Sequence, residues 1–295
     1  MRVVSLLPSA TEIVAALGRY DDLVGVTFEC DEPAAARTDK AVVVGGRDTR
    51  GMSPAAIDEY VRAQLASGAD LYTLHADALA GLAADVVITQ DLCRVCAVPS
   101  DQVDSALLHL GCDGADVVSL DPYTLDDVLA TIGTVGAHIG APDEAAELVT
   151  SLRRRLATLA AAVAGRRRPR VAVIEWVDPP FRAGHWIPDL VSAAGGDPVA
   201  SNPGAPSTQT SWDEIAAADP EVVLVSPCGF HLDGAIAQAE LVVDRFPDAQ
   251  VWAIDADGLV VRPGPRVVTG AEALAAILHP GAVPAPPQGV IARIR

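Results

Sequence analysis

Residues 142–165 read PDEAAELVTSLRRRLATLAAAVAG, and no other proline or glycine stands between Pro142 and Gly165. A proline followed by the acidic residues Asp143 and Glu144 is typical of a helix start. Apolar side chains then recur at spacings of three and four residues, the repeat of a helix with one apolar face: Leu148, Leu152, Leu156, Leu159 and Val163. At ~1.5 Å per residue this helix reaches roughly 30 Å, which is long enough to bridge two lobes of a protein.

Short strand patterns alternate with helical patterns on both sides of this helix. The strands that we expect are 2–5, 23–27, 41–44, 71–72, 85–89 and 116–119 before it, and 170–175, 222–226, 251–254 and 259–261 after it. Alternating strands and helices form mainly parallel sheets that helices cover. The sequence therefore predicts the α/β class, with two α/β lobes bridged by one long α-helix.

The domain boundaries follow from this helix. We expect an N-terminal α/β lobe at 1–141, the bridging helix at 142–168, a C-terminal α/β lobe at 169–279 and a tail at 280–295. A chain of 295 residues is the usual size of two domains. Within the second lobe, Ser211 stands three residues before Glu214, which is the spacing of a helix capping box.

The charge of the chain argues against a nucleic-acid partner. The 39 acidic residues outnumber the 21 basic ones, and the formal net charge is −18. Nucleic-acid binding depends largely on neutralising phosphates with Lys and Arg. The basic run from Arg166 to Arg170 follows the long helix, where cations complement the helix dipole.

The N-terminal segment MRVVSLLPSATEIVAALG has no pattern of a signal peptide. Pro8, Ser9, Thr11 and Glu12 interrupt any apolar core. No stretch of ~20 uninterrupted apolar residues is present, so we expect no membrane insertion. On these grounds the sequence predicts a cytoplasmic protein.

Polar and aromatic side chains gather directly after the expected strands. In sheets of this class, ligands bind at the carboxyl ends of the strands. The candidate ligand-binding residues in these loops are Ser9, Thr11, Phe28, Glu29, Gln90, Asp91, Trp176, Phe181, His185, Trp186, Gly229, Phe230 and Arg262.

Cysteines occupy the same loops. Cys93 and Cys96 have the spacing C-x-x-C, and Cys30 and Cys228 each follow a different strand. Four thiolates suit tetrahedral zinc or an iron–sulfur cluster, with His185 and His231 as additional ligands. The alternative for Cys93 and Cys96 is that they are packed thiols at a helix entry, because a lone C-x-x-C is a weak signal.

Several longer segments resemble the cobalamin and iron-siderophore class of ABC-transporter substrate-binding proteins. These segments are VVSLLPSATEIVAALG (3–18), DDLVGVTFECDEP (21–33), AADVVITQ (83–90), GHWIPDLVSAAGG (184–196), DPEVVLVSPCGF (219–230) and VRPGPRVVTGAEALA (261–275). The resemblance covers nearly the whole chain, to about His279. It is more specific for the fold and the family than for the ligand.

The resemblance implies a non-catalytic protein that binds a large small-molecule ligand, cobalamin or a related corrinoid, in a cleft between the lobes. By position, Trp176, Phe181, Trp186 and Phe230 form the apolar wall of the second lobe, and Phe28 and the loop at Ser9 face them from the first. An ABC permease is the partner that the family implies, although the missing export signal argues against one.

The alternative is a metal or iron–sulfur protein, a redox enzyme or a sensor, that uses the four cysteines. A hydrolase is disfavoured because the chain has no G-x-S-x-G motif. An ATPase is disfavoured because the phosphate-binding G-x-x-x-x-G-K-[ST] motif is absent.

Overall fold

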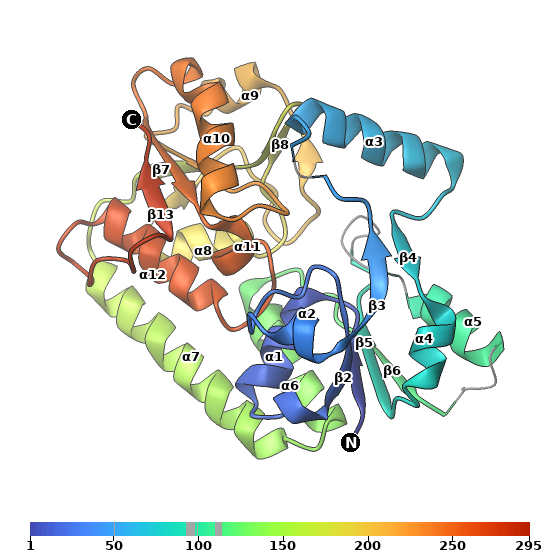
Figure 1. The fold of residues 1–295 in the computed structure, drawn as a ribbon. Coiled ribbons are helices and arrows are strands. Elements are labelled where there is room, and N and C mark those ends of the chain that lie inside the picture. Colours follow the sequence, from blue (N-terminus) through green and yellow to red (C-terminus); the bar gives the residue numbers. More distant parts are fainter. Residues whose placement is uncertain (50, 93–97, 99, 110–113) are drawn as a thin grey trace. The chain divides into compact units, whose positions relative to one another are not determined.

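The computed structural model describes residues 1–49, 51–92, 98, 100–109 and 114–295 (Figure 1). The described residues divide into two compact units. Unit 1 contains Met1–Pro122 and Leu129–Thr150, and unit 2 contains Tyr123–Val128 and Ser151–Arg295. Each unit has its own sheet, which confirms the predicted α/β fold with two lobes. The sheet of unit 1 is mainly parallel, as predicted, whereas the sheet of unit 2 is mixed, with three parallel and three antiparallel strand pairs.

The sheet of unit 1 has the strand order β4-β3-β2-β1-β5-β6. Neighbouring strands are parallel except β3 and β4, which are antiparallel. The strands are β1 (Val3–Ser5), β2 (Leu23–Thr27), β3 (Ala41–Gly46), β4 (Tyr72–Leu74), β5 (Val86–Thr89) and β6 (Asp116–Ser119). The helices are α1 (Pro8–Ala16), α2 (Ala36–Asp39), α3 (Pro54–Ser67), α4 (Ala76–Gly81), α5 (Ser100–His109) and α6 (Leu125–His138), with a 3-10 turn η1 (Tyr20–Asp22).

The central strands of unit 1 are apolar on both faces because helices and loops cover both. All residues of β1 and β5 are buried, as expected for parallel strands in the middle of a sheet. One core cluster joins Val4, Val43 and Val87 from three strands with Leu79 of α4. This packing holds the carboxyl ends of the strands, and therefore the loops that follow them, along one edge.

The sheet of unit 2 has the path β10-β8-β7-β11-β12-β13, with β9 paired to β7. The strands are β7 (Arg170–Val177), β8 (Pro180–Arg182), β9 (Asp197–Pro198), β10 (Thr208–Gln209), β11 (Val222–Val225), β12 (Gln250–Ile254) and β13 (Ile291–Arg293). The helices are α8 (Ile187–Ala193), α9 (Trp212–Ala217), α10 (Leu232–Val242), α11 (Ala256–Leu259) and α12 (Val267–Leu278), with a 3-10 turn η2 (Val243–Arg245). β7, β11 and β12 are parallel neighbours.

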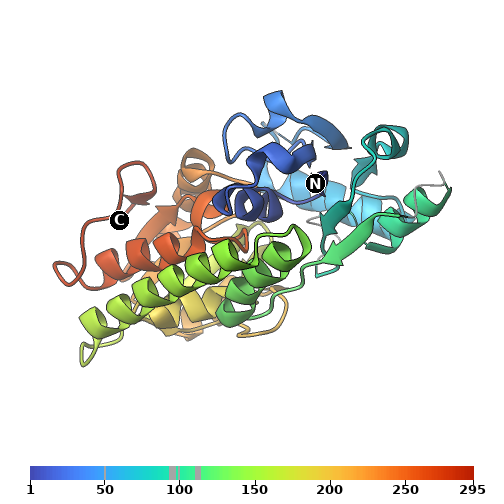
Figure 2. The same ribbon diagram turned by 90° about the horizontal axis from the view of Figure 1, so that it is seen from below.

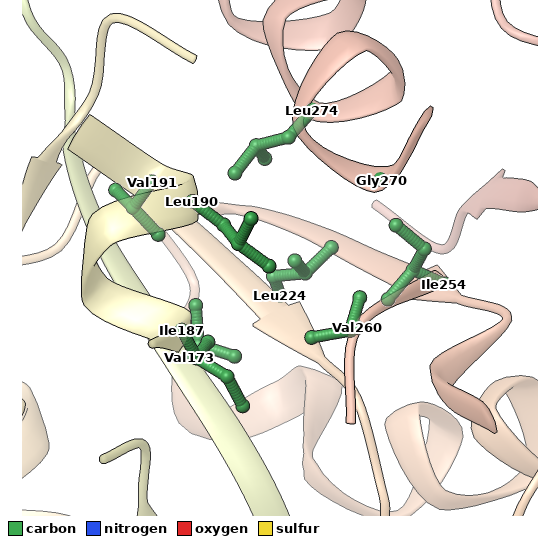
Figure 3. A pocket seen from close by; sticks show the side chains of 9 residues that line it. All are labelled: Val173, Ile187, Leu190, Val191, Leu224, Ile254, Val260, Gly270 and Leu274. Atoms are coloured by element: carbon green, nitrogen blue, oxygen red, sulfur yellow. The ribbon is translucent and has the colours of Figure 1, made fainter. Parts of the chain in front are cut away.

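The strands of unit 2 bury alternate residues on opposite faces. Ala172 and Val223 belong to the cluster that packs against α10. Val173 and Leu224, the next residues along each strand, face α8 and α12 instead (Figure 3). On that side a cavity of about 10 Å³ remains among purely apolar side chains, so it is a packing gap in the core and too small for a ligand.

The long helix α7 (Pro142–Val163) is present as predicted (Figure 2). Its residues up to Thr150 belong to unit 1, and those from Ser151 belong to unit 2. Leu152 and Leu159, two positions of the predicted apolar stripe, are buried. Within unit 2, Arg155 of α7 makes two hydrogen bonds to the carboxylate of Glu272 in α12, at 2.9 and 2.6 Å. The compact units therefore divide inside the helix, whereas the expected boundaries were at its ends.

Three features of unit 2 differ from the expectation. The strand expected at 259–261 is absent from the described structure, because Leu259 is the last residue of α11. The side chain of Asp255 caps this helix by accepting a hydrogen bond from Gly258 N–H. The expected tail at 280–295 ends in β13, which pairs with β12. The antiparallel pair of β8 and β10 was not predicted from the sequence.

Among the described residues, no helix is both long and apolar enough to cross a membrane.

Candidate functional site

The carboxyl ends of β7, β11 and β12 bring three loops of unit 2 to one edge of its sheet. These strands are neighbours and parallel, so Trp176, the loop after Val225 and Asp255 lie at the same edge. This is the edge at which ligands bind in α/β sheets. We call it the unit 2 edge.

Trp176 and Phe230 form an aromatic pair at the unit 2 edge. Their ring centroids are 5.8 Å apart and the planes are tilted by 49°. The indole N–H of Trp176 donates to the carbonyl of Asp178 at 3.1 Å, which fixes the ring. The ring of Phe230 lies over Gly234, where a Cβ atom would be only 2.3 Å from Phe230 Cδ1. Glycine at 234 is therefore required for the ring position.

Phe181 lies directly opposite Trp176 in the β7–β8 hairpin. Side chains of directly opposed residues in an antiparallel pair lie on the same face. The structure therefore brings together three of the four aromatic residues that were predicted for this wall: Trp176, Phe181 and Phe230.

Trp186, the fourth predicted aromatic residue, belongs to the core. It is only 5% exposed, and its indole N–H donates to the carbonyl of Val260 at 2.8 Å. The prediction that Trp186 lines a ligand surface is therefore corrected. The cause is its place at the start of α8, which packs against β7 and α12.

His185 is also turned toward its own unit. Its imidazole lies between the rings of Tyr123 and Trp186, with centroid distances of 5.7 and 5.8 Å. Burial lowers the pKa of His185 from its usual 6.5. Among the described residues, its Nε2 atom is buried and has no hydrogen-bond partner. Tyr123 was not predicted as a site residue.

A charged network surrounds the loop after β11. Arg262 pairs with Asp257 at 3.0 Å, and both side chains are largely buried. The backbone N–H of Gly229, a residue with φ of 84°, donates to Asp257 Oδ1 at 2.9 Å. The predicted residues Gly229 and Arg262 are thus held by one carboxylate, and Asp257 is the member of the network that the sequence did not indicate.

His231 and Asp255 form a second pair at the same edge. His231 Nδ1 lies 2.8 Å from Asp255 Oδ1. Burial alone would raise the pKa of Asp255, but hydrogen bonds from His231 and from Gly258 N–H hold that pKa below its ordinary value. Asp255 therefore faces the imidazole of His231 as an ionised carboxylate.

Unit 1 carries an aromatic and acidic group at its own edge. The rings of Phe28 and Tyr72 are 6.1 Å apart, and Phe28 packs over Gly46, where a Cβ atom would be 2.5 Å from Phe28 Cζ. The hydroxyl of Tyr72 donates toward the carboxylate of Glu29, 3.4 Å from each oxygen. Tyr72 was missed because β4 is antiparallel, so the first residue of β4 lies opposite the last residue of β3.

Other predicted residues of unit 1 have internal contacts. Ser9, Thr11 and Gln90 are buried. Thr11 Oγ1 lies 2.9 Å from Ser5 Oγ and 3.1 Å from Cys30 Sγ. Asp91 is exposed, and it accepts hydrogen bonds from the backbone and hydroxyl of Ser100, at 2.9 and 2.6 Å. A direct contact of Ser9, Thr11 or Gln90 with a ligand stays a prediction.

The cysteine hypothesis receives no support from the part of the chain that the structure describes. Cys30 is buried and Cys228 is exposed. Cys93 and Cys96 lie outside the described residues. Within those residues, no group of three or more His, Cys, Asp or Glu side chains could hold a metal ion. A zinc or iron–sulfur site that includes Cys93 and Cys96 stays a prediction.

The chain is similar to a known family and to several of its solved members. A sequence model described as periplasmic binding protein matches residues 3–253. The vitamin B12-binding protein of Vibrio cholerae is 25% identical over 92% of this chain and 86% of its own. The cobalamin-binding protein of Halobacterium salinarum is 25% identical over 94% of this chain and 69% of its own.

Two solved structures have the same fold. The periplasmic vitamin B12-binding protein BtuF of Vibrio cholerae has a TM-score of 0.68 and 24% identity, with 94% of this chain and 96% of that chain covered. A periplasmic heme-binding protein of Pseudomonas aeruginosa has a TM-score of 0.70 and 23% identity, with 99% of this chain and 97% of that chain covered. The similarity is to solute-binding proteins, which confirms the prediction that the chain is not an enzyme.

The comparisons also correct the predicted location. The matching family is described as periplasmic, and so are the similar solved structures. The prediction of a cytoplasmic protein is therefore wrong. It depended on the composition of the first residues alone.

Proposed function

The chain belongs to the periplasmic binding protein family, and from that premise we propose that it binds cobalamin or a related corrinoid outside the cytoplasm and delivers it to an ABC permease. The family membership places it among substrate-binding proteins of the vitamin B12, heme and siderophore type. The choice of a corrinoid within that group, and the place at which it binds, are the proposal.

The aromatic surface of the unit 2 edge carries the proposal. Trp176 and Phe230 are in ring contact and Phe181 lies opposite Trp176, while Asp257 and Arg262 form an ion pair at the same edge. A corrin is a flat macrocycle with apolar faces and a rim of amide groups. Aromatic rings pack against such faces, while a few placed polar groups bind the rim and fix the orientation.

The net charge supports a corrinoid over an anionic ligand. The chain has a formal charge of −18, and a field of that sign slows the approach of anions. Many ferric siderophores are anionic, whereas cobalamin is neutral or carries a single positive charge. The relatives named for vitamin B12 or cobalamin binding agree with this choice.

Equilibrium titration tests the proposal. The protein is titrated with cyanocobalamin, dicyanocobinamide, hemin and a ferric siderophore, and binding is followed by tryptophan fluorescence and calorimetry. We expect saturable binding of cobalamin at micromolar concentration or below. Trp176→Ala should weaken it by about 10-fold, or on the order of 1.4 kcal/mol, because one ring face is lost.

Trp252→Ala is the matched control. Trp252 lies on β12, and its ring pairs with Arg293 rather than with Phe230. The distance from Arg293 Cζ to the centroid of the Trp252 ring is 5.8 Å. Its removal should leave the affinity unchanged in protein that unfolds at a similar temperature. The absence of heat and quenching with both corrinoids would exclude the proposed ligand. An equal loss of affinity in both variants would contradict the proposed binding site at the unit 2 edge.

A further inference from the structure

Positive charge is concentrated in one segment of this acidic chain. Between Glu147 and Glu175 there is no acidic residue, and seven arginines are present: Arg153, Arg154, Arg155, Arg166, Arg167, Arg168 and Arg170. The segment carries a formal charge of +7, which leaves −25 for the rest of a chain whose total is −18. All seven arginines belong to unit 2, on the second half of α7 and directly after it.

Three of these arginines pair with carboxylates of unit 2. Arg155 pairs with Glu272 of α12 at 2.6 Å. Arg167 and Arg170 both pair with Glu221. These contacts join α7 and β7 to the rest of the unit, so the fold accounts for them.

The other four arginines are exposed, and we call them the arginine stripe: Arg153, Arg154, Arg166 and Arg168. The helix dipole favours cations at the end of α7, but Arg153 and Arg154 stand about ten residues before that end. Arg153 lies 3.9 Å from Asp126, and both side chains are mostly exposed to solvent. An ion pair of that kind contributes little to stability, so the dipole and the fold do not account for the stripe.

The remaining guanidinium groups of the arginine stripe have no carboxylate partner in the part of the chain that the structure describes. Arg154 contacts only a serine hydroxyl, at 3.5 Å. Arg166 donates to the carbonyl of Ala162 at 3.1 Å, and Arg168 donates to the carbonyl of Gly196 at 2.5 Å. Carboxylates are abundant in a chain with 39 acidic and 21 basic residues, yet none is placed against these three groups. Their charge is available to an anion from outside.

Small side chains separate the two ends of the arginine stripe. The exposed residues between Arg154 and Arg166 are Ala157, Thr158, Ala160, Ala161, Ala164 and Gly165. At ~1.5 Å per residue, this surface is roughly 20 Å long. α12 runs along one side of α7 (Figure 1), and the small residues lie on the solvent side. A flat anionic surface can therefore approach both groups of arginines without meeting a large side chain between them.

The chemistry of the arginine stripe selects phosphate groups. Guanidinium groups bind phosphate oxygens through two parallel N–H donors, and the stripe contains arginine without lysine. The chain belongs to a family of substrate-binding proteins that work outside the cytoplasm beside a membrane permease. In that place, a surface rich in phosphate is the layer of lipid headgroups around the permease.

We propose that the arginine stripe docks unit 2 on the phosphate headgroups of anionic membrane lipids. The contact is peripheral, and charge complementarity determines its direction: the rest of the chain, at −25, is repelled by the same lipids, so the stripe faces them. Attraction of this kind acts over about 8 Å at physiological ionic strength, so the docking depends on salt. The inference depends on where the family works and is independent of which ligand this chain binds.

Flotation of the full chain with lipid vesicles tests the proposal. Vesicles of phosphatidylcholine with about 30% phosphatidylglycerol are compared with vesicles of phosphatidylcholine alone, at about 0.05 M and about 0.5 M salt. We expect the protein to float with the anionic vesicles at low salt. It should stay in solution with neutral vesicles and at high salt.

Two double variants with the same change in net charge locate the contact. Arg153→Gln/Arg154→Gln should weaken vesicle binding on the order of 30-fold, because each arginine at an anionic surface contributes a factor of about 5. Arg293→Gln/Arg295→Gln is the matched control, since both residues are exposed and belong to β13 and the chain end, at the edge of the sheet beyond β12. The control should bind vesicles within about 2-fold of the wild type. Both variants should melt near the wild-type temperature and bind cyanocobalamin as the wild type does.

Each other outcome overturns the inference. Equal weakening in the two variants would indicate an effect of net charge alone, and flotation with neutral vesicles, or with neither kind, would exclude docking on anionic lipids. Displacement by inorganic phosphate at constant ionic strength would assign a site for free phosphate, and binding of duplex DNA without flotation would assign a nucleic acid. Loss of flotation leaves the proposed function intact, and failure to bind cobalamin leaves this inference intact.

Discussion

At the scale of single residues, His185 combines an unusual backbone with a partly buried ring. Its φ is 50°, a left-handed conformation that is uncommon for residues other than glycine, although Asn, Asp and His adopt it more often than the rest. The pKa of its imidazole is lowered because burial disfavours the charged form. The folded protein therefore holds this histidine in its neutral form, against Tyr123 and Trp186.

We expect His185 to make the protein less stable in mild acid. Below about pH 6.5, the usual pKa of histidine, the unfolded chain binds a proton that the folded chain accepts only at its lower pKa. The free energy of unfolding contributed by this group is therefore present above that pH and falls as the pH decreases. His185→Asn cannot titrate and suits a left-handed backbone, so its stability should fall less between about pH 7.5 and about pH 5.5.

Urea unfolding at several pH values measures this difference. The comparison at about pH 7.5 shows what the substitution costs apart from titration, because both proteins are then uncharged at position 185. Parallel dependence of wild type and variant on pH would contradict the expected role of burial.

At the scale of elements, α9 shows a complete local signal that the structure reproduces. Ser211 accepts a hydrogen bond from Glu214 N–H at 3.1 Å, and Glu214 accepts one from Ser211 N–H at 3.3 Å. Glu214 also pairs with Arg182 of β8 at 2.7 Å, so the capping residue ties the helix to the hairpin. Ile215 of the same helix is fully buried in the core of unit 2.

Ser211→Ala should lower the free energy of unfolding by about 1 kcal/mol, the usual cost of losing a side-chain cap. The physical reason is that Glu214 N–H loses its partner at the first turn. Ser211→Thr keeps the hydroxyl and is the matched control, with an expected change of a few tenths of a kcal/mol at most. Denaturant unfolding followed by circular dichroism checks both; equal stability of the alanine variant and the wild type would show that the cap is dispensable.

At the scale of the whole molecule, two units with separate cores share one helix. α7 contributes buried leucines to the fold and, within unit 2, the bidentate contact of Arg155 with Glu272. A ligand that binds only the folded protein stabilises it by mass action. The gain in the free energy of unfolding depends on the ligand concentration relative to Kd. A stability measurement therefore tests whether the proposed ligand binds.

Cobalamin at one hundred times its Kd should raise the free energy of unfolding by about 2.7 kcal/mol. At the same concentration, Trp176→Ala with a Kd about 10-fold higher should gain only about 1.4 kcal/mol. Calorimetric melting with and without cobalamin measures both increments. Equal increments in the two proteins would contradict the contact of Trp176 with the ligand, and none in either would contradict binding.

Local signals explain how much could be predicted from the sequence. The start of α7 at Pro142, the cap at Ser211 and the apolar runs of β5 and β11 depend on neighbours within a few residues, and the structure confirms each. The end of β11 was therefore predictable, and with it the loop that holds Phe230, whereas β7 extends two residues beyond its expected end and includes Trp176.

Features that depend on distant partners were not predictable in this way. β8 and β10 are short strands of three and two residues. β8 exists because it pairs with β7 across a hairpin, and β10 exists because it pairs with β8, more than twenty residues earlier in the chain. Asp255 follows the expected strand at 251–254 and was not predicted as a site residue, yet its carboxylate caps α11 and contacts His231. Trp176 and Trp186 are the same residue type, ten positions apart, and both were expected to face the ligand. Only the packing of α8 shows that the ring of Trp186 belongs to the core.

The sequence by itself determined the α/β class, the long helix and the loops that hold many of the candidate binding residues, because periodicity, caps and strand ends are recorded in neighbouring residues. Only the tertiary structure decided which of those residues share an edge, which rings are buried, and that His231 meets Asp255. The physical reason is that these outcomes depend on the pairing of β7, β11 and β12. Strand pairing joins residues that are tens of positions apart, and no local pattern specifies it.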